Sequence, residues 1–297
     1  MNNLISSKRK TFFIVLIVCL NVIGKESDDE VKQVKVGNFA VRGTTQPGSL
    51  LGFGQNIIDQ YDTLGVFYSI INLGKDLNFT HLVPEILYGL RDDLSIILAF
   101  PIAAKSKYGD HSSSGMSDIV VQMEYAVYGN HKPTYTNQIS LVGSVALPSG
   151  NECKNPSIGF GSPTFFLGFV FEHLATEWYG YTSYGGLITT KNGTEIKAGN
   201  QFLYQAGFGR NIAYAPNRWT CMWLVEFSGN YQKKAKLNGC TEDNSGSNSI
   251  LVGPALWFST NRFIIEAGAA PFVYQNLFGC GQLRSSCFIS VYTAFRF

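Results

Sequence analysis

Apolar and polar residues alternate over long segments of this chain, and this pattern limits the possible folds more than any other feature. The terminal stretch "CFISVYTAFRF" places Ile289, Val291 and Phe295 on one face and Ser290 and Arg296 on the other. A period of two indicates a β-strand, because successive side chains of a strand point to opposite faces. The same alternation recurs at 64–72, 94–103, 117–129, 134–148, 163–173, 218–232 and 262–273. The chain is therefore predicted to be all-β.

The predicted strands are longer than those of soluble sheets. They span roughly 10 to 15 residues, against about 5–6 in soluble proteins and about 9–11 in a tilted membrane strand. Only 15% of the residues are charged, whereas soluble domains average about 25%. A soluble sandwich or lipocalin-like barrel would expose charge on its outer strand faces. Here one face of each strand is continuously apolar, which predicts that outer-membrane lipid covers it.

Short and long connections take turns along the chain. The short turns fall at 89–93, 129–134, 173–177, 214–218 and 259–262, and the long polar loops fall at 105–115, 149–161, 190–200, 233–248 and 274–286. Barrels of bacterial outer membranes combine tight periplasmic turns with long outer loops. We predict a transmembrane antiparallel up-and-down β-barrel of about 12 strands. The alternative is 14 strands, if 34–42 and 49–58 both join the sheet; otherwise 49–58 tucks into the lumen or rim.

The start of the chain has the pattern of a secretory signal peptide. A cationic "SKRK" precedes the apolar "TFFIVLIVCLNVIG", which is shorter than the ~20 residues that a membrane-spanning helix needs. The predicted organisation is a signal peptide at 1–24, a periplasmic or lumenal segment at 25–60 and the barrel at 61–297. Such a chain belongs in the outer membrane of a Gram-negative bacterium, as a multi-pass protein.

Aromatic residues gather near the predicted strand ends. Trp178 with Tyr179, and Phe295 with Phe297, are examples. Outer-membrane barrels carry aromatic girdles at both interfaces, where amphipathic rings lie at headgroup level. These residues are predicted to form such girdles.

Polar side chains take the opposite phase to the apolar face. Eight carboxylate and amide residues are predicted to face the lumen, because a charge at mid-depth on the lipid face is costly: Glu85, Glu124, Glu172, Glu226, Glu266, Gln122, Gln138 and Gln205. Four arginines take the inward phase close to the periplasmic ends: Arg210, Arg218, Arg262 and Arg296. The carboxylates either line a path that favours cations or form the solvated, salt-bridged filling of a narrow barrel.

Five cysteines follow the signal segment, and an exported chain can oxidise them. Cys280 and Cys287 flank the last long loop, and Cys153 and Cys240 lie on two other long loops. Disulfides Cys280–Cys287 and Cys153–Cys240 are one of three pairings of these four, and free thiols are the alternative. Cys221 is expected near the periplasmic rim, unpaired. Neither cysteine nor histidine spacing indicates a metal site, no cofactor is expected, and a net charge of +2 gives no reason to expect nucleic acid.

The histidines do not favour an enzyme. A barrel phospholipase needs a Ser–His–Asn set on an outward strand face, and His131 and His173 are expected in turns, with His111 in a loop and His81 at a strand edge. No Gly-x-Ser-x-Gly motif occurs in a strand–helix context. The chain is therefore predicted not to be an enzyme.

Several motifs resemble one family. "LYGLRDDLSIILAFPI", "SSSGMSDIVVQMEYAVY", "SVALPSG" and "GNQFLYQAGFG" are similar, in order and spacing, to segments of the outer-membrane proteins named for the meta-pathway of phenol degradation. Met116-Ser117 replaces that family's usual Leu-Gly. The resemblance runs from about residue 46 to the end of the chain.

The resemblance implies a function but identifies no binding residues. Its members are treated as transporters or channels, so we expect a monomeric outer-membrane channel or transporter for small solutes, hydrophobic or aromatic ones among them. The alternative is a structural or surface-interaction barrel with a closed lumen and exposed loops. By a further resemblance, a last strand that ends in Phe297 is similar to the signal read by the outer-membrane assembly machinery.

Overall fold

The computed structural model describes residues 53–297 except 55, 133, 194, 216, 217 and 261. The predicted signal peptide and residues 25–52, including the strand considered at 34–42, lie outside the described residues. Within the described part, no helix is long and apolar enough to span a membrane.

The strands are β1 Thr63–Gly74, β2 Leu77–Arg91, β3 Leu94–Ala99, β4 Ile102–Tyr108, β5 His111–Met116, β6 Ile119–His131, β7 Tyr135–Leu147, β8 Thr164–Ala175, β9 Trp178–Thr189, β10 Ile196–Lys197, β11 Gln201–Ala215, β12 Trp219–Gln232, β13 Lys236–Leu237, β14 Cys240–Thr241, β15 Ser247–Thr260, β16 Phe263–Leu277 and β17 Ser285–Arg296.

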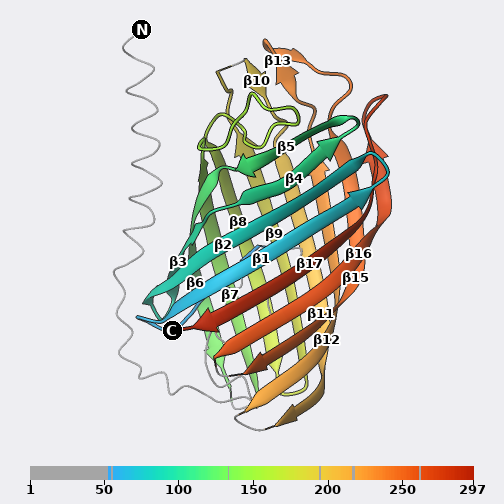
Figure 1. The fold of residues 1–297 in the computed structure, drawn as a ribbon. Helices are drawn as coiled ribbons and strands as arrows, with labels where there is room; N and C mark the ends of the chain where they lie inside the picture. Colours follow the sequence, from blue (N-terminus) through green and yellow to red (C-terminus); the bar gives the residue numbers. More distant parts are fainter. Residues whose placement is uncertain (1–52, 55, 133, 194, 216–217, 261) are drawn as a thin grey trace, which may run out of the picture. The chain divides into compact units, whose positions relative to one another are not determined.

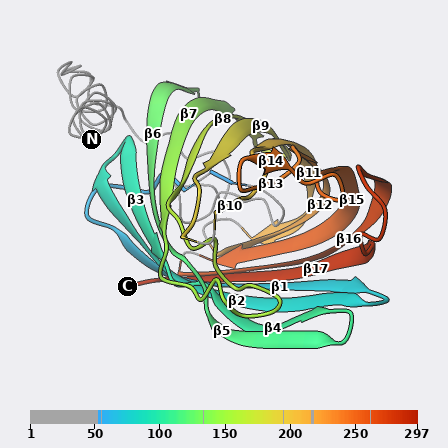
Figure 2. The same cartoon turned by 90° about the horizontal axis from the view of Figure 1, so that it is seen from above.

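The long strands form one closed antiparallel barrel (Figures 1 and 2). β1 pairs with β17 on one side and with β2 on the other, which joins the two ends of the sheet. The ring runs through β1, β17, β16, β15, β12, β11, β9, β8, β7, β6, β3 and β2. The predicted 12-strand barrel is confirmed. We call the end with the long loops the outer end, and the end with Thr63 and Phe297 the periplasmic end.

One predicted strand and one predicted loop are wrong. The segment 94–103 is not a single strand, because it breaks at Phe100-Pro101, where proline has no amide hydrogen for the ladder. β3 pairs with β6, but β4 pairs with the outer half of β2. The polar segment 105–115 then forms most of the β4–β5 hairpin, which extends the sheet at one side.

The outer face of the barrel is an apolar belt. Leu167, Ile188 and Leu256 are 70%, 55% and 59% exposed on three different strands. Leu167 and Leu256 have buried neighbours on both sides along their strands, and Ile188 lies between the partly buried Leu187 and the buried Thr189. Side chains this apolar and this exposed need an apolar solvent. Together with the closed barrel, the belt makes the chain a multi-pass outer-membrane protein, in contact with lipid.

The last strand closes the barrel with the first. The Phe297 amide donates to the Thr63 carbonyl at 3.1 Å. A Cβ atom added to Gly65 would lie 2.8 Å from the Phe297 ring, so only glycine allows this approach. The Phe297 backbone thus extends the β1–β17 pairing, while its ring stays exposed over Gly65. Its recognition by assembly machinery stays a prediction.

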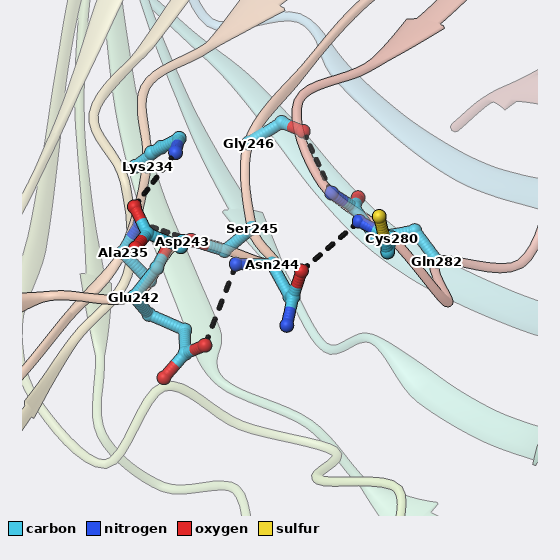
Figure 3. Close-up of polar contacts among 9 residues, drawn as sticks. All are labelled: Lys234, Ala235, Glu242, Asp243, Asn244, Ser245, Gly246, Cys280 and Gln282. Atoms are coloured by element: carbon cyan, nitrogen blue, oxygen red, sulfur yellow. Dashed lines mark hydrogen bonds and ion pairs between the residues drawn. The ribbon is translucent and has the colours of Figure 1, made fainter.

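Hydrogen bonds tie two outer loops together (Figure 3). Lys234 and Asp243 form an ion pair of 3.0 Å within the β12–β15 loop. The Cys280 amide of the β16–β17 loop donates to Asn244 Oδ1 at 3.0 Å, and Gln282 Nε2 donates to the Gly246 carbonyl at 3.2 Å. These loops are therefore folded and not merely solvated.

The five cysteines among the described residues are free thiols. Cys153, Cys240 and Cys280 are exposed, while Cys221 and Cys287 are partly buried. Cys287 belongs to β17 and not to a loop, opposite Leu73 and Pro271 on the neighbouring strands. The disulfide pairings stay a prediction.

Candidate functional site: the barrel lumen

All eight predicted polar residues lie on the inward phase of their strands. The carboxylate side chains Glu124, Glu172, Glu226 and Glu266 are almost fully buried, as are the amides Gln138 and Gln205. Glu85 and Gln122 are partly buried. Their burial between exposed apolar neighbours such as Met123 follows from the strand period of two.

Arg296 and Arg210 lie on opposite faces of the barrel wall. Arg296 faces inward and forms an ion pair with Asp62 at 2.6 Å, at the periplasmic end. Arg210 is opposite Trp178 and Trp223 on the outer face, and it pairs with Glu177 at 3.4 Å. Its predicted inward phase is wrong, because it lies five residues from the inward Gln205 on β11, and an odd spacing puts two strand residues on opposite faces.

Phenol and amide groups hold two of the buried carboxylates. Tyr179 Oη donates to Glu172 Oε1 at 3.2 Å, and Gln138 Nε2 donates to Glu172 Oε2 at 3.3 Å. Tyr181 Oη donates to Glu226 Oε1 at 3.0 Å. The register aligns Glu172 of β8 with Tyr181 of β9, and Tyr181 with Glu226 of β12 across Gly207 of the intervening β11. The inner wall thus carries a hydrogen-bonded polar band, which runs from the periplasmic third of β8 to the middle of β12.

The chain before β1 lies inside the barrel. The Phe53 amide donates to Gln205 Oε1 at 3.3 Å, the Asn56 amide to Glu124 Oε2 at 3.0 Å and the Ile58 amide to Ser95 Oγ at 3.0 Å. Of the two predicted locations for 49–58, the described residues 53, 54 and 56–58 take the lumenal one. Glu124 and Gln205 therefore bind backbone as well as line the wall.

Toward the periplasmic end the inner face is apolar. Ile57 and Ile58 are 0% exposed. Ile58 packs in one buried cluster on the inner wall with Leu64, Val66, Leu87, Ile97, Leu174, Tyr179, Tyr181, Met222, Leu224, Ala255, Trp257, Ile264 and Ala294. We call this set the periplasmic cluster. The sequence predicted polar residues on the inner face but not this apolar set, against which Ile58 of the lumenal segment packs.

The inward, buried positions of two tyrosines were not predicted from the sequence. Tyr179 was expected in a girdle, yet it is 1% exposed and hydrogen-bonds to Glu172, whereas the adjacent Trp178 is 40% exposed. Adjacent strand residues face opposite sides, so the two rings cannot share a girdle. The pattern "WYGYTSYG" has aromatic residues in both phases, and this hid the inward Tyr179 and Tyr181.

Three histidines are not where they were expected: His111 begins β5 and His131 ends β6, and His173 departs furthest. His173 lies within β8, on the outward face and not in a turn, and its Nδ1 is 2.6 Å from Asn137 Oδ1. Its other described partners are the rings of Tyr135 and Trp178. A His–Asn pair exists, but no serine is among its described partners. His173 therefore completes an aromatic girdle.

These features can be set against known proteins. The sequence profile of the family described as "Putative MetA-pathway of phenol degradation" matches residues 45–271. The chain belongs to this family. The fold is that of an outer membrane channel from Pseudomonas putida F1, which is 12% identical with a TM-score of 0.68, over 85% of this chain and 100% of that one.

A further structural likeness is weaker. The NanC porin is 9% identical with a TM-score of 0.48, over 78% of this chain and 100% of the porin. No curated protein matches the chain in sequence. The family and the barrel are thus shown, and the eight inward residues receive no role from these relatives.

Proposed function

We propose that this member of the family is an outer-membrane channel or transporter for small solutes, hydrophobic or aromatic ones among them, and not an enzyme. The observation that supports this most strongly is the polar band, in which carboxylates, amides and phenols line the inner wall of a closed barrel. Such a lining suits the passage of a solute better than it suits a purely structural core, because buried polar groups cost free energy. The channel named among the structural relatives is consistent with it.

The aromatic lining bears on the kind of solute. Tyr179, Tyr181 and Trp257 are buried on the inner wall beside the carboxylates, and the rings of Phe53 and Phe166 meet edge to face at 4.5 Å nearer the outer end. Rings of this kind favour flat apolar molecules. The family's description, which names phenol degradation, agrees with such solutes.

A second candidate is a surface-interaction barrel with a closed lumen. It is favoured by the periplasmic cluster, since Ile57 and Ile58 have no exposed surface. On the channel proposal, this contact is the closed state of a gate. On the second proposal, it is permanent, and the folded outer loops contact a partner.

Planar-bilayer recordings of the purified, signal-less protein decide between them. Discrete conductance steps support the channel. Silence in the bilayer, together with adhesion that depends on the outer loops, would support the closed barrel instead. The protein is expected to act as a monomer, which cross-linking in detergent tests.

A further inference from the structure

A row of inward side chains crosses four neighbouring strands in the periplasmic half of the lumen. Trp257 of β15, Glu266 of β16, Tyr292 of β17 and Tyr68 of β1 are successive register partners. Side chains on one face of directly opposed residues have Cβ atoms about 4.5–5.5 Å apart. Trp257 and Glu266 are each 1% exposed, and both tyrosines pack against the periplasmic cluster. Glu266 thus lies between Trp257 and Tyr292, and Tyr68 follows one strand further along the row.

Glu266 differs from the other buried carboxylates. Among the described residues, its buried Oε1 has no hydrogen-bond partner. Glu172 and Glu226, by contrast, each accept hydrogen bonds from tyrosine hydroxyls. A buried carboxylate oxygen without a donor is costly, so this oxygen is suited to a donor that a ligand brings.

The groups around Glu266 favour the binding of a cation. Glu226 lies close enough to interact electrostatically with Glu266, and Glu85 and Glu266 both act on Tyr292. A cation bound here would be attracted by these carboxyl groups, and the faces of Trp and Tyr rings attract cations as well. The described residues offer no set of three His, Cys, Asp or Glu side chains that could hold a metal ion. An organic cation fits this chemistry better than a metal.

The neighbouring wall suits an apolar body. Met222, opposite Trp257 on β12, is fully buried, and Leu224 and Ile264 lie beside it in the periplasmic cluster. An unbranched thioether side chain adapts to new shapes more readily than a branched one. The wall next to Glu266 can therefore rearrange around a bound hydrocarbon or aromatic group.

We propose that Glu266, with the rings of Trp257, Tyr292 and Tyr68, binds the ammonium group of an amphiphilic amine, a small organic cation with an apolar or aromatic body. The ammonium donates to Glu266 Oε1, and the rings cover its remaining faces. This inference rests on the proposed function, because it names a class of solute for the same lumen.

Equilibrium binding tests the site without requiring passage. In the full chain, Trp178, Trp219 and Trp223 are changed to Phe, so that Trp257 is the only tryptophan. The folded protein in detergent is titrated with 2-phenylethylamine, 2-phenylethanol and 3-phenylpropanoate. The amine should change the Trp257 fluorescence saturably, at least about tenfold more tightly than the alcohol or the acid, as expected for a hydrogen bond to a charged group.

Matched variants assign the effect to Glu266. Glu266→Gln should weaken amine binding at least about tenfold and leave binding of the alcohol unchanged. Glu177→Gln removes the same charge from an exposed rim side chain and should leave both affinities unchanged. Heat-modifiable gel mobility checks folding. If Glu266→Gln does not fold, Glu266→Asp replaces it and should weaken the amine selectively.

The outcomes separate this inference from the proposed function. Equal affinity for amine and alcohol, or unchanged amine affinity in Glu266→Gln, overturns the ammonium site even where bilayer recordings show a channel. Selective amine binding that Glu266→Gln abolishes supports the site. If the same protein is silent in bilayers, the channel proposal fails while the site stands.

Discussion

A charge placed on the outer face of β8 tests the lipid belt. Phe169 is 46% exposed, and it lies five residues from Thr164 and six from Ala175, the two ends of β8. At about 3.3 Å per residue these separations are ~17 and ~20 Å along the strand. A tilt of about 40° makes them ~13 and ~15 Å of depth, which puts Phe169 near the middle of the ~25 Å apolar band. Phe169→Arg should therefore destabilise the barrel by about 2–4 kcal/mol.

The matched control is the same change near the interface. Phe165 is 39% exposed on the same face, one residue from the outer end of β8, so Phe165→Arg should cost about 0–1 kcal/mol for the charge. The loss of a phenyl ring is common to both variants. Reversible guanidinium titration in phosphatidylcholine vesicles, followed by tryptophan fluorescence, measures the difference. Equal costs at the two depths, or a water-soluble Phe169→Arg protein, would refute the belt.

Three further predictions concern the lumen and the loops. Glu124→Gln and Glu226→Gln should each shift the reversal potential in a salt gradient toward lower cation selectivity, and unchanged potentials would remove these side chains from the path. Tyr179→Phe removes the 3.2 Å hydrogen bond to Glu172 and should cost about 1.5–3 kcal/mol in the same titration, whereas Tyr184→Phe on the exposed face should cost close to nothing. A membrane-impermeant maleimide added to intact cells should label Cys240 and Cys280 but not Cys221; labelling of Cys221 alone would reverse the assigned orientation.

The alternation of side chains made the barrel predictable. A strand such as β8 shows its lipid face in Phe165, Leu167, Phe169 and Phe171, because that face meets only hydrocarbon and tolerates no charge. The eight inward residues followed from the same physics. Strand breaks were harder to predict, since Pro101 could end a strand or sit at an edge, and only the pairing of β4 with β2 decides which.

The interior was less predictable for a different reason. Leu64, Val66 and Ile264 are apolar and lie on the inner face. Where a strand is apolar on both faces the alternation disappears, so the sequence does not show which apolar residues face inward. Their burial depends on Ile57 and Ile58, a segment without strand periodicity whose position is set by contacts far along the chain. Ser95 and Glu124 each accept a hydrogen bond from the backbone of this segment, and no local pattern indicates such bonds.

The central claim is that the periplasmic cluster is a gate in a barrel that passes solutes. Liposome swelling in a small neutral solute tests it most directly, with the parent protein compared to a variant carrying Ile57→Ala and Ile58→Ala. Both side chains are 0% exposed, so shortening them should loosen the closure and speed swelling several-fold. Ile188→Ala on the lipid face, where the side chain is 55% exposed, should swell like the parent. A folded gate variant that swells no faster than protein-free liposomes would contradict the account.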